Sequence, residues 1–295
     1  MVKSRQKEIK KQRTNLIINV LIALLFATGI GVFSYPFFVD SLNNYLSQKM
    51  IEKHQRETIE QNQKNREQAL KNMVAENEKR KEPNTIVGIG LLEELFDSKN
   101  TRGNYPAEYY EERLLGALYI PKIHASLPIF NETNDVLLEK GTTLLSGTSY
   151  PIGGESTHSV ITGHTDLPEK MIFTKLEKLE EGDHFFLDVM GEMLAYKVEQ
   201  IQVVLPEEIE SLAIQEGREL VTLLTCTPYM INSHRLLVTG YRVPYVKEMA
   251  EKIQYTKKYH NIRLLIFGIL LIVFLTVFFY WIWRKNVYYQ IIKHL

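Results

Sequence analysis

The sequence has one cysteine in 295 residues, Cys226, which excludes an intramolecular disulfide framework and a cysteine-rich zinc site. It also has no excess of charge, because 35 lysines and arginines balance 35 aspartates and glutamates. Nucleic-acid binding would need a clustered basic surface or a known reading motif, so it is not expected. The sequence shows no phosphate loop, metal-ligand cluster or cofactor fingerprint, and we therefore expect neither a metal nor a cofactor.

Charged residues are missing from two long apolar runs, one between Arg13 and Asp40 and one at 264–283. Each run is long enough to cross a hydrocarbon layer of about 30 Å as a helix. The first run exceeds the apolar core of about 7–15 residues of a cleaved signal peptide, and no small-x-small cleavage site follows it. We therefore predict transmembrane helices at 15–39 and 264–283.

Flanking charges predict the orientation of these helices. Six basic residues and a single acid, Glu8, precede the first run, and positive flanks stay in the cytoplasm. With two spans, the tails 1–14 and 284–295 are expected to be cytoplasmic, and residues 40–263 are expected outside the cell. A lone thiol outside the cell is informative, because such thiols tend to be oxidised or paired unless they are kept for use.

Glycine and proline are absent from 41–82, which is rich in Glu, Lys, Gln, Asn and Arg. This composition favours one or two long polar helices, and without a sustained heptad the segment 40–87 is expected to be a solvated helical stalk. The domain at 115–246 instead has short apolar runs between turn residues, which indicate strands. The runs are 117–120, 159–162, 184–189, 195–204, 220–226 and 236–243. They predict a closed, mainly β barrel, followed by a linker at 247–263.

Three residues of the β region are candidates for chemistry. Cys226 ends an apolar run just before Thr227 and Pro228, where a strand should give way to a turn, so it is either a nucleophile or a small buried hydrophobe. His164 also lies at a strand end and could exchange a proton with the thiol. From spacing alone, the other histidines of the domain compete with it, namely His124, His158, His184 and His234.

Arg235 follows Cys226 by nine residues. If the two flanking runs pair as antiparallel strands, Arg235 returns beside the thiol, where its guanidinium could donate hydrogen bonds to an oxyanion or a substrate carbonyl. A surface ion pair is the alternative role for this arginine. Upstream, Tyr105, Tyr109 and Tyr110 are expected to pack the segment that enters the barrel.

Together these segments resemble the sortase family. The resemblance rests on Thr162-Gly163-His164, on Thr222-Leu223-Leu224-Thr225-Cys226 and on Asn232-Ser233-His234-Arg235-Leu236, in the order of the family's His, TLxTC and Arg signatures. Further similar segments lie at 116–123, 127–129, 148–154 and 226–229, so the likeness covers about 115–245. The two anchors and the long N-terminal segment resemble class C, the pilus-assembling branch. The resemblance implies an eight-stranded β-barrel with N-terminal helices, in Gram-positive bacteria.

The resemblance also implies roles for individual residues. Cys226 would attack the Thr–Gly carbonyl of an LPxTG-like sorting signal to give a thioacyl-enzyme, and His164 would protonate the leaving amine. Arg235 would stabilise the oxyanion, and Thr225 would contribute to substrate binding. In class C relatives the acceptor is a lysine of the next pilin, so the expected partners are pilin or surface proteins that bear the sorting signal.

One part of the family pattern does not match. Class C sortases usually cover the site with a lid that carries Asp-Pro-aromatic or Asp-x-aromatic, but in the lid-like segment 88–114 the aromatic Phe96 precedes the acid Asp97. Lys99 stands where the ring would be. We expect a weakly closed lid in which Asp97 contacts Arg235.

Two other functions remain open from the sequence. The chain could attach surface proteins to a peptidoglycan amine, with the same three catalytic residues. It could instead be a non-catalytic membrane scaffold, although a scaffold has no need of Cys226, His164 and Arg235 together.

Overall fold

The computed structural model describes residues 2–60, 63–81, 105–167, 170–208 and 210–294. The chain forms two compact units, one made of 1–41 with 262–295 and the other of 42–261. The helices are α1 (Val2–Glu60), α2 (Gln63–Arg80), α4 (Ala107–Glu111), α5 (Asp135–Leu138) and α6 (Lys247–His294), with short 3-10 turns η1 (Pro121–Ile123), η2 (Leu176–Lys178) and η3 (Glu210–Leu212).

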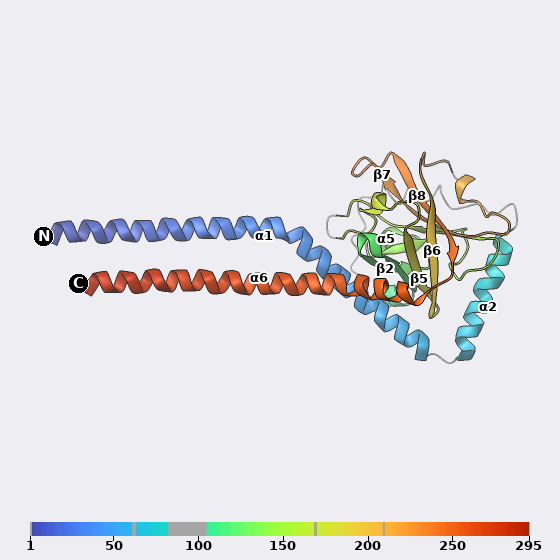
Figure 1. The fold of residues 1–295 in the computed structure, drawn as a ribbon, viewed down its shortest axis with the longest axis horizontal. Helices are drawn as coiled ribbons and strands as arrows, with labels where there is room; N and C mark the ends of the chain where they lie inside the picture. The colour runs from blue at the N-terminus through green and yellow to red at the C-terminus, as the bar shows by residue number, and fades with distance from the viewer. Residues whose placement is uncertain (1, 61–62, 82–104, 168–169, 209, 295) are drawn as a thin grey trace. The chain divides into compact units, whose positions relative to one another are not determined.

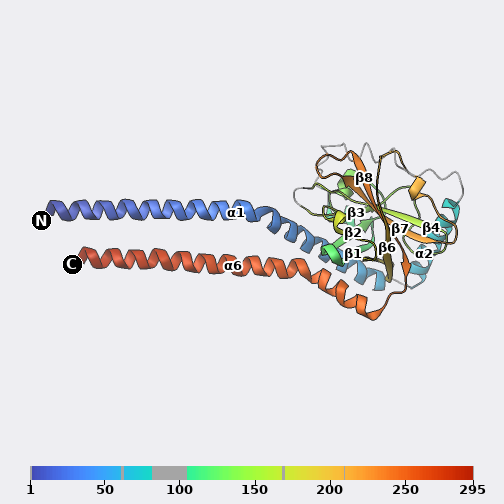
Figure 2. The ribbon, with the colours of Figure 1, turned by 45° about the horizontal axis from the view of Figure 1, so that its top comes forward.

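The second unit contains a closed eight-stranded barrel, as the sequence predicts (Figure 1). The strands are β1 (Leu114–Ile120), β2 (Ala125–Phe130), β3 (Thr142–Leu144), β4 (Thr157–Thr162), β5 (His184–Val189), β6 (Glu192–Val204), β7 (Glu219–Thr227) and β8 (His234–Val243). Their order around the barrel is β1-β2-β3-β4-β7-β8-β6-β5. The β2–β3 and β4–β7 pairs are parallel and the others antiparallel. Figure 2 shows β4, β7 and β8 side by side.

The strands alternate between a core inside the barrel and smaller clusters outside it. On β1, Leu118 and Ile120 belong to the main core, whereas Ala117 and Tyr119 pack outside with Phe186 of β5. Because β1 is buried on both faces, it is a continuous apolar run with no polar alternation.

Two strands lie outside the apolar runs that predict strands. β2 contains Pro128, which has no backbone N–H and so argues against a strand interior. β3 has only three residues, and its Thr142 hydroxyl donates to the Pro128 carbonyl at 2.8 Å. The strand conformation of both segments therefore depends more on pairing with neighbouring strands of the barrel than on their own hydropathy.

The segment 42–60 of α1 differs from the expected solvated stalk. Ile51 is 1% exposed and packs in the cluster with Tyr119, and the Gln48 amide oxygen accepts a hydrogen bond from the Ser126 hydroxyl at 2.6 Å. Gln55 donates to the Tyr119 hydroxyl at 3.0 Å and to Asp188 at 2.6 Å. This segment of α1 therefore packs against the outside of the barrel.

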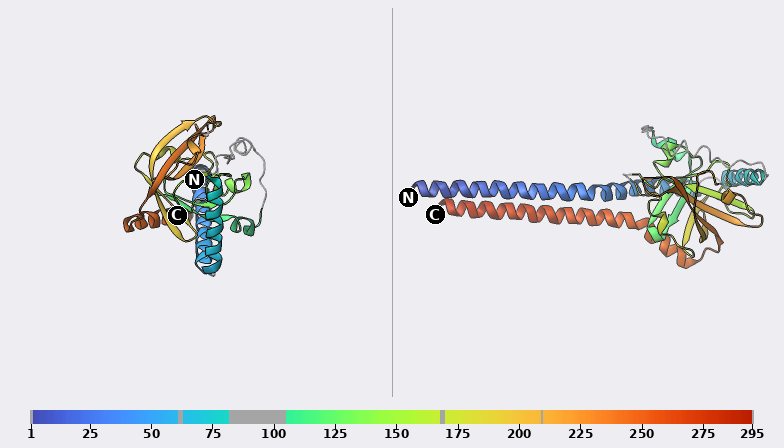
Figure 3. Two further views of the ribbon diagram at one scale, coloured as in Figure 1. Left: turned by 90° about the vertical axis from the view of Figure 1, so that its right-hand side faces the viewer. Right: turned by 90° about the horizontal axis from the view of Figure 1, so that it is seen from above.

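The segment 247–263, expected as a linker, begins α6 and is helical. Ile253 is buried in the same cluster as Ile51, and the His260 ring lies 3.2 Å from the His124 carbonyl oxygen. Lys257 lies over the Tyr119 ring, with its Nζ 4.8 Å from the ring centre. Helical turns from both ends of the 42–261 unit therefore pack on the barrel. The α2 helix of the same unit is visible in Figure 3.

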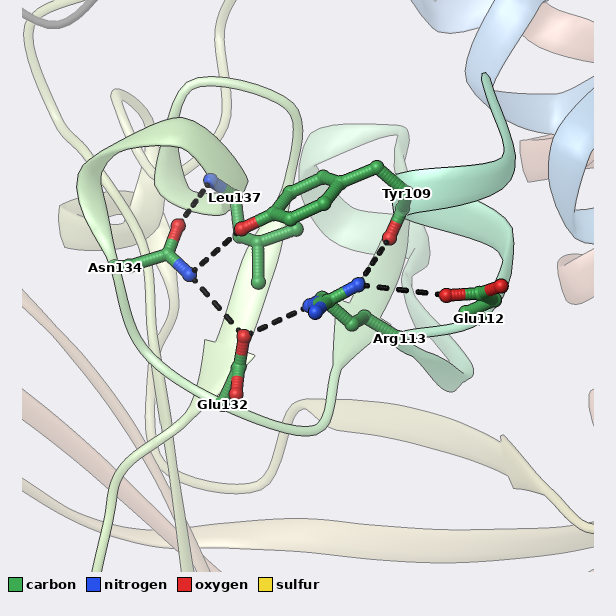
Figure 4. A network of polar contacts seen from close by, with 6 residues as sticks. All are labelled: Tyr109, Glu112, Arg113, Glu132, Asn134 and Leu137. Carbon is green, nitrogen blue, oxygen red and sulfur yellow. Dashed lines mark hydrogen bonds and ion pairs between the residues drawn. The ribbon is translucent and has the colours of Figure 1, made fainter. Parts of the chain in front are cut away.

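A polar network fixes the entry to β1 (Figure 4). Arg113 donates to Glu132 at 2.9 Å, and its guanidinium lies 4.0 Å from the centre of the Tyr109 ring. Asn134 caps α5 by accepting from the Leu137 N–H at 3.0 Å and donates to the Tyr109 hydroxyl at 3.2 Å. Tyr110 is buried against Phe130 and Tyr109 packs on the same cluster, as expected, whereas Tyr105 is 42% exposed and its ring contacts Tyr109.

The first unit consists of the apolar parts of α1 and α6, which lie side by side and antiparallel in Figures 1 and 2. Phe38 and Phe267 pack edge to face with ring centres 6.5 Å apart, and Arg263 pairs with the buried Asp40 at 3.3 Å. Both helices are long and apolar enough to cross a membrane, and their apolar windows are not covered by other parts of the described chain. These two apolar helices agree with the two predicted membrane segments.

Candidate active site

Three neighbouring strands bring the predicted catalytic residues together. Cys226 on β7 pairs directly with Arg235 on β8, as antiparallel pairing of the two runs requires. On the other side of β7, Thr162 of β4 pairs in parallel with Leu224, and the Gly163 N–H continues the ladder by donating to the Leu224 carbonyl at 3.1 Å. The described pairing ends at Thr162 and Leu224, and His164 lies two residues beyond the end of β4, in the loop that Gly163 begins.

The alternation of side chains places Cys226 and Arg235 on one face of the barrel. Leu223 of β7 and Leu236 of β8 point into the main core, so their neighbours Leu224 and Leu237 point to the outer face, where they share a cluster. Cys226 is two residues from Leu224, and Arg235 is two residues from Leu237, so their side chains point to the same outer face. The site is therefore on the outside of the barrel, at the end of β7.

The site is secluded from solvent. The Cys226 side chain is 3% exposed and that of Arg235 is 7% exposed, whereas His164 is half-buried. Burial lowers the pKa of His164, and the charges of Asp166 and Asp135 oppose this shift. A neutral imidazole near pH 7 can accept a proton from a thiol, which is what nucleophilic use of Cys226 requires.

Backbone carbonyls hold the Arg235 guanidinium in place. Its Nη1 donates to the carbonyls of Asn232 at 3.0 Å and of His234 at 3.2 Å. Asn232 lies in the β7–β8 turn with a left-handed φ of 60°, and His234 is the first residue of β8. The turn thus fixes the orientation of a permanently charged donor beside Cys226.

The Thr225 side chain points to the opposite face of β7 from that of Cys226, and it links the loop that carries His164 to β7. Its hydroxyl donates to the Gly163 carbonyl at 2.6 Å and lies 2.9 Å from the Thr165 hydroxyl. It is buried at 1% exposure, so these contacts position the backbone around His164. A direct contact of Thr225 with substrate stays a prediction.

The structure separates His164 from the competing histidines. His158 lies on the same outer face of β4 but six residues earlier, where its ring is 2.7 Å from the Thr222 hydroxyl and 2.9 Å from the Ala213 carbonyl oxygen. His184 begins β5, and His124 stacks on Tyr259 of α6 with ring centres 4.1 Å apart. His234 pairs with Thr227, one position beyond Cys226.

Two site residues were missed by the sequence reasoning. Asp166 and Asn232 are joined by a hydrogen bond of 3.1 Å, which connects the loop after His164 to the turn before Arg235. An acid two residues after a candidate histidine is a detectable signal, but its partner 66 positions away is not. The lid candidates Phe96 and Asp97 lie outside the described residues.

Comparisons with known proteins agree with this geometry. A family model described as a sortase domain matches residues 118–243. The solved structure of sortase C1 of pilus island 1 of group B Streptococcus is 35% identical, with a TM-score of 0.59, and the match covers 68% of this chain and 94% of that one. Sortase C-1 of Streptococcus pneumoniae is 41% identical, with a TM-score of 0.59 and coverage of 67% and 100%.

Curated relatives are more distant. Sortase D of Bacillus subtilis is 30% identical over 131 residues, which are 43% of this chain, and the chain spans 63% of that relative's length. Sortase A of Streptococcus agalactiae is 24% identical over 221 residues, which are 72% of this chain and 79% of that protein.

Proposed function

Because this chain belongs to the sortase family, and within it to the class C sortases, we propose that it is a membrane-anchored cysteine transpeptidase. The observation that carries the proposal is the direct pairing of Cys226 with Arg235, with His164 in the loop that follows β4, the strand on the other side of β7. This arrangement provides a nucleophile, a base and an oxyanion donor at the same end of β7.

In the proposed first step, His164 takes the thiol proton and the Cys226 sulfur attacks the Thr carbonyl of an LPxTG-like sorting signal. Arg235 donates hydrogen bonds to the oxyanion of the tetrahedral intermediate. When the intermediate collapses, the Thr–Gly bond breaks and the imidazolium gives its proton to the leaving glycine amine. The product is a thioester between Cys226 and the threonine carbonyl.

In the second step, an amine attacks the thioester. His164, neutral again, accepts a proton from the attacking amine, and the Cys226 thiolate leaves. We propose that the acceptor is a lysine side chain of a pilin subunit, so that repeated cycles build an isopeptide-linked polymer. Related solved structures support this choice, since one is a sortase of a pilus island and another is described in terms of pilin substrate specificity.

The proposed location is the cell membrane, with the barrel outside and both termini in the cytoplasm. The two apolar helices and the basic residues before the first one support it. A Ser4→Cys variant on a Cys226→Ala background should be protected from a membrane-impermeant maleimide in intact cells and should react after lysis. Labelling in intact cells would contradict the orientation.

The proposed reaction is tested with the full chain in detergent and an LPxTG peptide, analysed by mass spectrometry. We expect an acyl adduct on Cys226, no adduct in Cys226→Ala, and a loss of about 100-fold or more in the acylation rate of His164→Ala. A folded protein that gives no adduct would contradict the transpeptidase and favour a scaffold.

The acceptor is tested on the same acyl-enzyme. A lysine-bearing pilin domain and a peptidoglycan-type amine are offered in competition, and the released products are weighed. Preferential isopeptide formation on the pilin domain supports polymerisation. Preferential transfer to the peptidoglycan amine would overturn it in favour of surface-protein anchoring.

A further inference from the structure

A side-chain hydrogen bond joins the loop that carries His164 to the turn that precedes Arg235. The loop after β4 contains His164 and Asp166, and the β7–β8 turn contains Asn232 immediately before Ser233, His234 and Arg235. The Asn232 amide Nδ2 donates to Asp166 Oδ2 at 3.1 Å. We call this contact the Asp166–Asn232 bridge.

The bridge continues into the arginine. The Asn232 carbonyl accepts from Arg235 Nη1 at 3.0 Å, and the Asn232 N–H donates to the Pro228 carbonyl at 3.0 Å. The φ of 60° at Asn232 is a conformation that asparagine and glycine adopt more readily than other residues. One asparagine therefore connects the Asp166 carboxylate to the guanidinium that faces Cys226.

The Asp166 carboxylate also acts on His164 through its charge. It is the largest contribution that raises the pKa of His164 against the lowering caused by burial, and Asp135 of α5 contributes in the same direction. Among the described residues, the neighbouring strands β7 and β8 add the ionisable Cys226 and Arg235 at the same end of the barrel. A negative charge here favours the imidazolium that the proposed mechanism forms when the thiol is deprotonated.

We infer that Asp166 is a positioning residue of the catalytic pair, which fixes the His164 loop to the Arg235 turn through Asn232 and stabilises protonated His164 by its charge. This inference rests on the proposed function, since it assigns a role in that reaction. The assigned role requires no contact of Asp166 with substrate or with the reacting atoms. It acts through the orientation and the proton affinity of His164.

Two variants of the full chain in detergent separate charge from geometry. Asp166→Asn removes the charge and keeps an oxygen that can accept from Asn232. Asn232→Gly removes the amide, keeps the left-handed backbone accessible and leaves the charge of Asp166. Asp183→Asn is the matched charge control, because Asp183 lies in the turn before β5, which neighbours neither β4 nor β7. Melting temperatures establish that each variant is folded.

The effect of the Asp166 charge on the pKa of His164 is measured by NMR titration of histidine-labelled protein. The His164 signal is assigned from the His164→Ala spectrum. We expect the pKa of His164 to fall in Asp166→Asn and to stay unchanged in Asp183→Asn and Asn232→Gly. An unchanged pKa in Asp166→Asn would overturn the electrostatic role. This measurement needs no peptide, so it stands even if the proposed function fails.

The geometry is measured by acylation with the sorting peptide and by alkylation of Cys226 with iodoacetamide at pH 7. In Asn232→Gly we expect kcat for acylation to fall about tenfold with little change in KM, and alkylation to slow. Because the two residues act as one unit, Asp166→Ala with Asn232→Gly should be no more than twofold slower than Asp166→Ala alone. Additive losses, or an Asn232→Gly variant with wild-type rates, would overturn the bridge. If the wild-type protein is alkylated on Cys226 but gives no acylation by the sorting peptide, it is the proposed function that has failed.

Discussion

At the scale of single residues, buried histidines make the barrel sensitive to acid. Burial lowers the pKa of His158 and of His164. In the unfolded chain these groups have a pKa near 6.5, so as the pH falls below that value the unfolded state takes up protons first. The stability of the folded state is therefore full above about pH 6.5 and is lost progressively as the pH falls toward the lower folded-state pKa values.

The sharper form of this prediction concerns His158, whose ring bonds the Thr222 hydroxyl and the Ala213 carbonyl. His158→Gln should lower the melting temperature at pH 7.5, because it disrupts two buried contacts. It should also make the fall in melting temperature between pH 7.5 and pH 5 smaller than in the wild type. Thermal melting followed by circular dichroism at both pH values measures this. An equal acid loss in the variant and the wild type would show that His158 is not a source of the pH dependence.

Gly116 tests how closely two strands of the barrel approach. A Cβ added there would meet the Asp188 carbonyl oxygen at 2.2 Å, a backbone atom that cannot move without displacing β5. We expect Gly116→Ala to reduce the free energy of unfolding by about 3 kcal/mol. Gly268→Ala is the control, since nothing lies within 4 Å of its added Cβ. Chemical denaturation in detergent should separate the two variants, and similar midpoints would contradict the predicted overlap.

At the scale of elements, the packing of α1 on the barrel is a stabilising interface. Ile51 is 1% exposed, whereas Ile59 on the same helix is 70% exposed. Removing a buried isoleucine side chain costs about 2–5 kcal/mol, so Ile51→Ala should lower the melting temperature clearly and Ile59→Ala should leave it nearly unchanged. Differential scanning calorimetry of both variants tests the interface. Equal melting temperatures would mean that α1 does not stabilise the barrel.

The same helix shows why the sequence predicts its secondary structure and not its contacts. The absence of glycine and proline favours a helix, which the structure confirms. Its buried face, however, includes the polar Asn44, Ser47 and Gln48, while the apolar Leu46 is 55% exposed. Polar residues can be buried when each finds a partner, as Gln48 finds Ser126, and such pairing is not encoded in hydropathy.

The barrel illustrates the opposite case. Alternating or continuous apolar runs between turn residues locate six strands, and the nine-residue spacing from Cys226 to Arg235 implies the hairpin that the structure contains. The placement of the His164 loop next to β7 needs the parallel β4–β7 pairing, which is a non-local contact. Spacing and periodicity left five histidines of the domain as candidates, and the resemblance to the sortase family selected His164 among them.

At the scale of the whole molecule, the chain divides where its hydropathy changes. One unit takes residues 1–41 and 262–295, and the other takes 42–261. The apolar helices α1 and α6 therefore contribute residues to both units. The second unit contains all eight strands and the three proposed catalytic residues, and it also includes the first turns of α6.

This division predicts different outcomes for two C-terminal truncations. A chain that ends at Asn261 keeps Ile253, which is 2% exposed, and His260, which contacts the His124 carbonyl. It should keep the wild-type melting temperature of the barrel and its acylation by the sorting peptide. A chain that ends at Val246 exposes the surface that Ile253 covers, so we expect a loss of about 2–4 kcal/mol and a melting temperature lower by about 10 °C. Equal stability of the two truncations would show that α6 serves the barrel only as a tether, whereas the expected difference makes its first turns part of the catalytic unit.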